Sequence, residues 1–254
     1  MKNYGLKLSI RKPEDYVLGG AQVVLSPLQP DGDWTTFLPV KEIQNLKGIE
    51  PFACVSYATL NCVEMLIKRK YGIERNFSDR FLAAISGTKD LMGNDPHAVG
   101  EYLRKVGAVS QETWPFDDTI KSFEDFYAVV PPKLYELAKE FTDEWDFKHF
   151  YVNNDPESIT KALQSSPLLI SVPAWHLNAD GFYYRPEGMY DNHATTLIYE
   201  RVGAFRRVFD SYDAPLIKDL TWDTIPTQIK GFSITKKEKL STLPWWKILL
   251  NWLK

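Results

Sequence analysis

Apolar residues in the first half of the chain recur at helical spacing. Between Phe52 and Tyr71 they return every three or four positions, and Gly72 then ends the pattern, which predicts a long, largely buried helix. Further helices are predicted over residues 79–86, 96–106, 132–141 and 155–164. Residues 1–39, which are broken by prolines, predict instead an extended arm that lies on the body of the protein.

The second half of the chain changes from a helical to a β pattern. Short apolar or aromatic runs predict strands over residues 167–172, 181–184, 194–200, 206–209 and 231–235. Short strands that follow a helical half are typical of an α+β protein. We therefore expect a helical lobe over about residues 40–125 and a sheet-rich lobe over about residues 126–235.

The chain ends in a basic tail, residues 236–254, with an apolar run at its end. From Leu243 onward only Lys247, Asn251 and Lys254 form a polar stripe, which predicts an amphipathic helix over residues 243–254. This segment is too short to cross a bilayer, which takes about 20 residues. Two interpretations stay open: the helix docks on its own body or on a partner subunit, or it binds a membrane surface, where tryptophans and lysines suit the headgroup boundary.

Charge and cysteine content narrow the class of protein. The chain has 254 residues and a net charge of −3, so no strongly basic face indicates a nucleic-acid partner. Cys54 and Cys62 lie eight residues apart on one predicted helix, and a rise of about 12 Å excludes a disulfide between them. Nothing in the N-terminal sequence matches a signal peptide, and no apolar run is long enough to span a membrane. We therefore expect a cytoplasmic protein, of a kind that suits a bacterial or phage origin.

Cys54 stands at the start of the longest predicted helix. The free N–H groups and the dipole of a helix N-terminus favour a thiolate, which is the nucleophilic form of cysteine, so we expect a lowered thiol pKa here. Free cysteines are also common as small buried apolar residues. A partner base decides between the two interpretations.

Among the four histidines, His193 has the context of such a base. It stands directly before the predicted strand 194–200, and the next strand, 206–209, returns toward it and ends at Asp210. In an antiparallel pair the start of one strand lies beside the end of the other, so His193 and Asp210 should meet. For His149 no acidic neighbour is evident in the sequence, and we expect it at the surface.

Local sequences around these residues resemble those of the papain-like cysteine peptidases, the family of papain and the cathepsins. Asp191-Asn192-His193-Ala194 is similar to the family's Asp-His-Ala, and Phe209-Asp210-Ser211-Tyr212-Asp213 is similar to its Lys-Asn-Ser-Trp-Gly, with aspartate in place of asparagine. Ser166-Pro167-Leu168-Leu169-Ile170-Ser171-Val172 is similar to its Gly-Pro-Val-Ser-Val strand. The resemblance covers roughly residues 39–235.

The resemblance implies a catalytic domain over residues 40–235 with two lobes, one helical and one an antiparallel, barrel-like sheet. It implies hydrolysis of peptide bonds in a peptide or protein substrate, without a metal or organic cofactor. Cys54 would be the nucleophile, His193 the base and Asp210 the group that orients it. The substrate groove would include Gly93, Asn94, Trp175, Asn192 and Tyr212.

Two departures from the family pattern matter for the chemistry. The family's oxyanion-hole glutamine lies six residues before the cysteine, where this chain has Gly48, so we expect Gln44 to serve if the loop of residues 46–52 is longer. The backbone N–H of Cys54 would be the second donor. Asp210 in place of asparagine favours the protonated imidazole, so the thiolate–imidazolium pair should persist to higher pH.

Two other functions fit the same residues. A cysteine amidase that acts on peptidoglycan presents Cys, His and a polar third residue in this order. A papain-like domain that has lost catalysis and serves only for binding would keep the fold. The sequence favours the peptidase.

Overall fold

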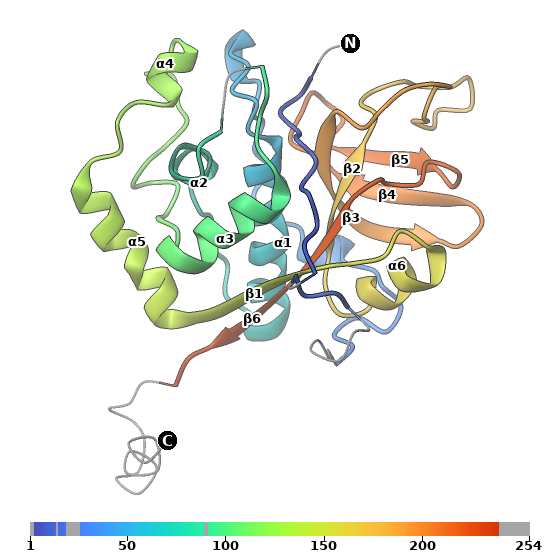
Figure 1. Cartoon of the computed structure of the whole chain (residues 1–254), viewed down its shortest axis with the longest axis horizontal. Helices are drawn as coiled ribbons and strands as arrows, with labels where there is room; N and C mark the ends of the chain where they lie inside the picture. Colours follow the sequence, from blue (N-terminus) through green and yellow to red (C-terminus); the bar gives the residue numbers. More distant parts are fainter. Residues whose placement is uncertain (1–2, 14, 19–25, 89–90, 239–254) are drawn as a thin grey trace, which may run out of the picture.

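The structure is a computed structural model, and it describes residues 3–13, 15–18, 26–88 and 91–238 (Figure 1). The amphipathic helix expected over residues 243–254 lies outside these residues. Within them, no helix has both the length and the apolar character that crossing a membrane requires.

Helices fill most of the first half of the chain and strands most of the second. The helices are α1 (Cys54–Tyr71), α2 (Asp79–Ile85), α3 (Pro96–Val106), α4 (Phe123–Phe126), α5 (Pro132–Glu144) and α6 (Pro156–Leu163), with short 3-10 turns at Thr35–Phe37 and Leu46–Gly48. The strands are β1 (Trp145–Tyr151), β2 (Leu168–Val172), β3 (His193–Arg201), β4 (Phe205–Phe209), β5 (Ile217–Thr221) and β6 (Ile229–Lys236). The α+β class predicted from the sequence is confirmed.

The six strands form one antiparallel sheet in the order β1-β6-β2-β3-β4-β5. Strands β1 and β5 are its two edges, so among the described residues the sheet is open. The expected barrel-like closure is therefore wrong. The pairing of β3 with β4 joins Thr196 to Phe209, which brings the first residues of β3 beside the residue that follows β4.

Helix α1 joins the helical side of the molecule to the sheet. Figure 1 shows α1 in the middle, with α2 to α5 on one side and β2 to β5 on the other. Every residue of α1 from Cys54 to Ile67 is buried, and the Thr196 hydroxyl on β3 donates to the carbonyl of Ala58 at 3.3 Å. One hydrophobic core therefore runs from the helices into the sheet. This packing sets the start of α1 next to the start of β3.

The N-terminal arm is extended along much of its described length and touches both sides of the molecule. Its first residues run between α3 and the sheet (Figure 1), where Tyr4 donates its N–H to the carbonyl of Asn192 at 2.9 Å. Further along, the N–H of Leu18 donates to the carbonyl of Tyr151 at 2.9 Å. Near its end, Trp34 is fully buried, and its indole N–H donates to the carbonyl of Leu163 at 2.7 Å.

Most elements predicted from the sequence are present, within a few residues at their ends. The exceptions are instructive. Residues 181–184 form no strand, only isolated bridges at Tyr183. Strands β1 and β5 and the short helix α4 were not predicted. His149, expected at the surface, is buried on β1, and its Nε2 lies 3.0 Å from the carboxylate of Glu101 on α3.

Candidate active site

Cys54 is the first residue of α1. The residue before it, Ala53, offers no side-chain cap, so the N–H groups of the first helical turn are not capped by a side chain at that position. The thiol is fully buried, and its sulfur accepts a hydrogen bond from the backbone N–H of Ala194 at 3.4 Å. Because Ala194 follows His193, this bond brings the sulfur to the start of β3.

His193 and Asp210 meet as the strand pairing predicts. His193 opens β3, Asp210 follows β4, and Nε2 of the imidazole lies 2.7 Å from Oδ1 of the carboxylate. Both side chains are fully buried. With Nε2 held by Asp210, the other nitrogen, Nδ1, has no hydrogen-bond partner among the described residues. Nδ1 is therefore the nitrogen that could exchange a proton with the nearby thiol.

Aromatic rings surround the imidazole of His193. The ring centroids of Trp175, Tyr4 and Tyr212 lie 5.4, 5.6 and 6.0 Å from it, each in an edge-to-face arrangement. Such rings exclude water from the His193–Asp210 pair, which strengthens its electrostatic interactions. Trp175 and Tyr212, both expected in the substrate groove, are thus next to the histidine.

A lysine that the sequence reasoning missed holds the other oxygen of Asp210. The ammonium of Lys218, on β5, donates to Oδ2 at 2.9 Å. Burial alone would raise the pKa of Asp210, but the charges of His193 and Lys218 and their hydrogen bonds outweigh it, and the pKa is lowered. Asp210 is therefore ionised in the folded protein.

The environment of the thiol opposes its ionisation. Burial raises the pKa of Cys54; the hydrogen bond from Ala194 opposes this, whereas the charges of Glu50 and Asp210 add to it. The lowered thiol pKa expected from the helix start is therefore wrong for the structure as it stands.

Residues 4–7 of the arm lie along the residues expected to bind substrate. The N–H of Asn94 donates to the carbonyl of Gly5 at 3.0 Å, and the N–H of Lys7 donates to the carbonyl of Asn94 at 2.9 Å. Leu6 pairs with Asn94 in the parallel direction. Together with the bond from Tyr4 to Asn192, these contacts hold the main chain of the arm against Asn94 and Asn192.

Two glycines allow the arm to approach this closely. A Cβ on Gly93 would lie 1.8 Å from the carbonyl oxygen of Gly5, and a Cβ on Gly5 would lie 2.2 Å from the carbonyl oxygen of Phe52. Both glycines have positive φ, 64° and 106°. The main chain of the arm therefore lies at backbone contact distance from Gly93 and Phe52.

Gln44 also lies beside residues 4–7 of the arm. It is fully buried, its backbone N–H donates to the carbonyl of Ser211 at 2.7 Å, and its Nε2 lies 3.5 Å from the carbonyl of Tyr4 in the arm. Its Oε1 has no partner among the described residues. The side-chain amide of Gln44 therefore faces a peptide carbonyl in the groove.

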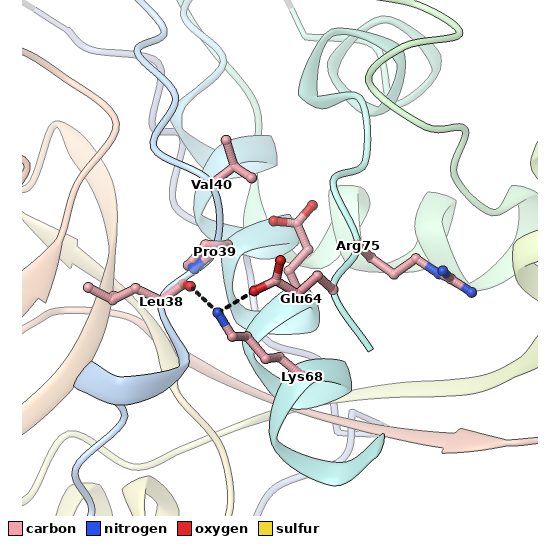
Figure 2. Close-up of a pocket in the computed structure, with 7 residues that line it drawn as sticks. Leu38, Pro39, Val40, Glu64, Lys68 and Arg75 are labelled. Atoms are coloured by element: carbon pink, nitrogen blue, oxygen red, sulfur yellow. Dashed lines mark hydrogen bonds and ion pairs between the residues drawn. The ribbon is translucent and has the colours of Figure 1, made fainter. Parts of the chain in front are cut away.

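A surface pocket lies elsewhere along α1 and contains none of these residues (Figure 2). Its polar lining includes Lys68, whose ammonium donates to the carbonyl of Leu38 at 3.3 Å and pairs with Glu74 at 2.8 Å. Glu64, also in the lining, accepts from the N–H of Phe77 at 2.6 Å, and burial raises the pKa of Glu64 well above its usual range. Glu64 therefore connects α1 to Phe77 in the chain that follows it, and Lys68 connects α1 to Leu38 before it and Glu74 after it.

Comparison with family models and with curated proteins finds no match. Solved structures do match. Xylellain, a cysteine protease from Xylella fastidiosa, aligns with a TM-score of 0.66 and 15% identity over 91% of this chain and 96% of its own. The bromelain protease from Ananas comosus, in complex with the E64 inhibitor, aligns with a TM-score of 0.57 and 18% identity over 82% of this chain and 98% of its own.

A third match is the structure of the cysteine protease and lectin-like domains of Cwp84, a surface layer associated protein of Clostridium difficile. Its TM-score is 0.59 at 16% identity, over 73% of this chain and 48% of that one, so this chain spans about half of its length. Together these likenesses show that the chain has the papain-like cysteine peptidase fold. The resemblance found in the sequence is thereby confirmed at the level of the fold.

The buried charges at Asp210 predict a large effect on stability. Asp210→Ala leaves the Lys218 ammonium buried without its counter-ion, which should lower the free energy of unfolding by about 3–5 kcal/mol. Asp219→Ala is the matched control. Asp219 lies on β5, the strand that carries Lys218, and pairs with Arg207 at 2.7 Å in a partly exposed position. That loss should stay below about 1 kcal/mol. Urea denaturation of both variants measures the difference, and equal losses would contradict the prediction.

The lowered pKa of Asp210 also predicts how stability depends on pH. Its interactions stabilise the fold above the pKa of an unfolded aspartate, about 3.9, and are lost as the pH falls through the lower, folded value. We expect the difference in free energy of unfolding between the unmodified protein and Asp210→Asn to shrink as the pH falls below about 4. Urea denaturation across this pH range measures it. A difference that stays constant would show that Asp210 does not titrate in this way.

Proposed function

We propose that this protein is a cysteine peptidase that hydrolyses peptide bonds with Cys54 as its nucleophile. One observation carries the proposal: a main-chain segment of the arm, residues 4–7, is held by main-chain hydrogen bonds to Asn94 and Asn192 beside the buried Cys54 thiol and the His193–Asp210 pair. A groove that binds main chain next to a thiol and an imidazole suits attack on a peptide carbonyl.

In the proposed reaction the Cys54 proton passes to Nδ1 of His193, and the sulfur forms a bond to the substrate carbonyl carbon. His193 then gives the proton to the leaving amine as the C–N bond breaks. Water, deprotonated by His193, hydrolyses the resulting thioester and releases the acid product. Asp210 accepts the Nε2–H bond, which keeps Nδ1 available for each proton transfer.

The negative oxygen formed during attack needs donors that are already in place. Gln44 and the backbone N–H of Cys54 are the proposed pair. The contact of Gln44 Nε2 with the carbonyl of Tyr4 supports this role, because the amide already faces a peptide carbonyl in the groove. At 3.5 Å this contact is long for a hydrogen bond, so it would have to shorten for a reacting oxygen.

The described form would be latent. Residues 4–7 cover the groove, and burial keeps the pKa of Cys54 raised, so the thiol is protonated while the arm is bound. A peptide substrate would have to replace the arm before it could reach the sulfur. Activity would then depend on how often the arm leaves.

Labelling of the thiol tests the proposed nucleophile. We expect E64, an epoxide that reacts with thiols, to modify the full-length protein at Cys54, and His193→Ala to abolish the modification because the imidazole no longer takes the proton. Cys62→Ser is the control and should leave labelling unchanged, since Cys62 lies buried in the middle of α1. Mass spectrometry of the intact protein and of its peptides identifies the modified residue.

Displacement of the arm should raise this reactivity. A Cβ at Gly5 would clash with the carbonyl of Phe52, so Gly5→Ala should shift the arm out of the groove and increase the rate of E64 labelling at least about tenfold, in proportion to the fraction of open molecules. Gly32→Ala is the matched control: its φ is also positive, 68°, but its Cβ would only touch Leu163 at 3.5 Å. Equal rates for the two variants would contradict the latent-form proposal.

The same experiments weigh the rival functions. The buried, protonated Cys54 also suits an inactive papain-like binding module, and absence of labelling in both the unmodified protein and Gly5→Ala would favour that function. A peptidoglycan amidase would release fragments from cell-wall polymer and leave a peptide library uncut. Incubation of Gly5→Ala with both substrates separates the amidase from the peptidase.

A further inference from the structure

Lys218 is the least expected residue of the site. It lies on the edge strand β5, yet its side chain is buried and points back toward Asp210. Its ammonium donates to Oδ2 of Asp210 at 2.9 Å and to the carbonyls of Tyr212, Asp213 and Pro215 at 2.9, 3.1 and 2.7 Å. It also lies 5.0 Å from the centre of the Trp175 ring. Four oxygens and an aromatic face therefore replace the hydration shell that the ammonium would have in water.

These contacts hold the turn of residues 210–216, which carries more than Asp210. The carbonyl of Ser211 in this turn accepts the N–H of Gln44, and the carboxylate of Asp213 accepts the side-chain amide of Asn45 at 2.7 Å. Lys218 thus connects, through one turn, the group that orients His193 and the segment that carries the proposed oxyanion donor. Among the described residues, Lys218 makes no hydrogen bond to the arm.

The charge of Lys218 has a separate effect. A lone carboxylate 2.7 Å from a buried imidazole would strongly favour the imidazolium, and an imidazolium that is too stable is a poor acid for the leaving amine. With the ammonium on its other oxygen, Asp210 belongs to an ion pair of zero net charge. To His193 this pair resembles an uncharged acceptor, such as the amide of an asparagine.

Other charged or titratable groups also face the site. They come from several elements: Cys54 from α1, Glu50 from the segment before it, Tyr4 from the arm, Tyr183 from the segment between β2 and β3, and Tyr212 and Asp213 from the turn after β4. The acidic groups among them are Glu50 and Asp213, and Lys218 is the cation that pairs with the carboxylate facing His193.

We propose that Lys218 is a positioning residue that acts through Asp210: it orients the Asp210 carboxylate toward His193 and cancels its charge, so that His193 can both accept and return a proton. This proposal rests on the proposed peptidase function of the same site. It replaces the expectation that Asp210 alone would extend the thiolate–imidazolium pair to higher pH.

Substitution of Lys218 and of Asp210, singly and together, provides the test. His193 titration is followed by NMR in the full-length protein carrying Cys54→Ala, so that no thiolate contributes, and its resonance is assigned by its loss in His193→Ala. Lys218→Met should move the titration to higher pH, because an unpaired carboxylate then faces the imidazole. Asp210→Asn should move it down, because an unpaired ammonium remains. The double variant should return it close to the starting value.

Lys230→Met is the matched control, because Lys230 is a second buried lysine, on β6, that packs 3.7 Å from the centre of the Tyr151 ring rather than at Asp210. It should leave the His193 titration unchanged. A merely structural lysine would not give shifts of opposite sign that cancel in the double variant. Unchanged titration in Lys218→Met and in the double variant would overturn the proposal. If Lys218→Met fails to fold, Asp210→Asn and the double variant, which leaves neither charge of the pair buried, still decide it.

Kinetics separate this proposal from the proposed function. In the Gly5→Ala protein, Lys218→Met should lower kcat for peptide hydrolysis about tenfold and leave KM nearly unchanged, because Lys218 makes none of its hydrogen bonds to the groove peptide; the double variant should recover most of the loss. If the protein hydrolyses peptides but the His193 titration does not shift, the proposed role of Lys218 is wrong and the proposed peptidase function still stands. The expected shifts without peptide hydrolysis would support the charge pairing and overturn the peptidase function.

Discussion

The packing of α1 against β3 is the constraint on which the rest of the site depends. Both elements are almost wholly buried, and they join the helical side of the molecule to the open sheet. Because α1 begins at Cys54 and β3 begins at His193, the same packing that forms the core also brings the Cys54 sulfur to the start of β3, where the N–H of Ala194 donates to it. The relative position of Cys54 and His193 therefore follows from the core itself. Any change that moved α1 along β3 would change the stability of the core and the geometry of the site together.

Behind this contact lie three polar groups in a row, His193, Asp210 and Lys218, buried beside aromatic rings. Lys218 and Asp210 compensate each other's desolvation, and loss of either one would leave a buried charge without its partner. The cation at the end of the row lies on an edge strand. Through this lysine, the edge strand β5 holds the turn of residues 210–216, which contacts both His193 and Gln44.

The sequence predicted the long elements and the His193–Asp210 contact because both follow from periodicity and antiparallel pairing. It failed at β5 because the inward-facing residues of that strand are Lys218 and Leu220, and a lysine among polar neighbours does not show the alternation of a strand. Lys218 could be recognised only once Asp210 was known to need a counter-ion. The strand expected at residues 181–184 was wrong because only Tyr183 forms bridges there, one of them to Leu220 of β5, while its ring packs on Trp175. Strand β1 did carry a signal, since Trp145, Phe147 and His149 alternate with exposed residues.

The close contact of Gly5 with Gly93 and Phe52 has a consequence for competition. The arm is part of the same chain as the groove, so it faces the groove at an effective concentration that for short flexible tethers is in the millimolar range. A free peptide that makes the same main-chain hydrogen bonds would therefore occupy only a small share of molecules unless it were abundant or bound far more tightly. A single break in the backbone between the arm and α1 would remove this advantage at once. The arm would become an ordinary dissociable ligand, and the occupancy of the groove would depend on dilution.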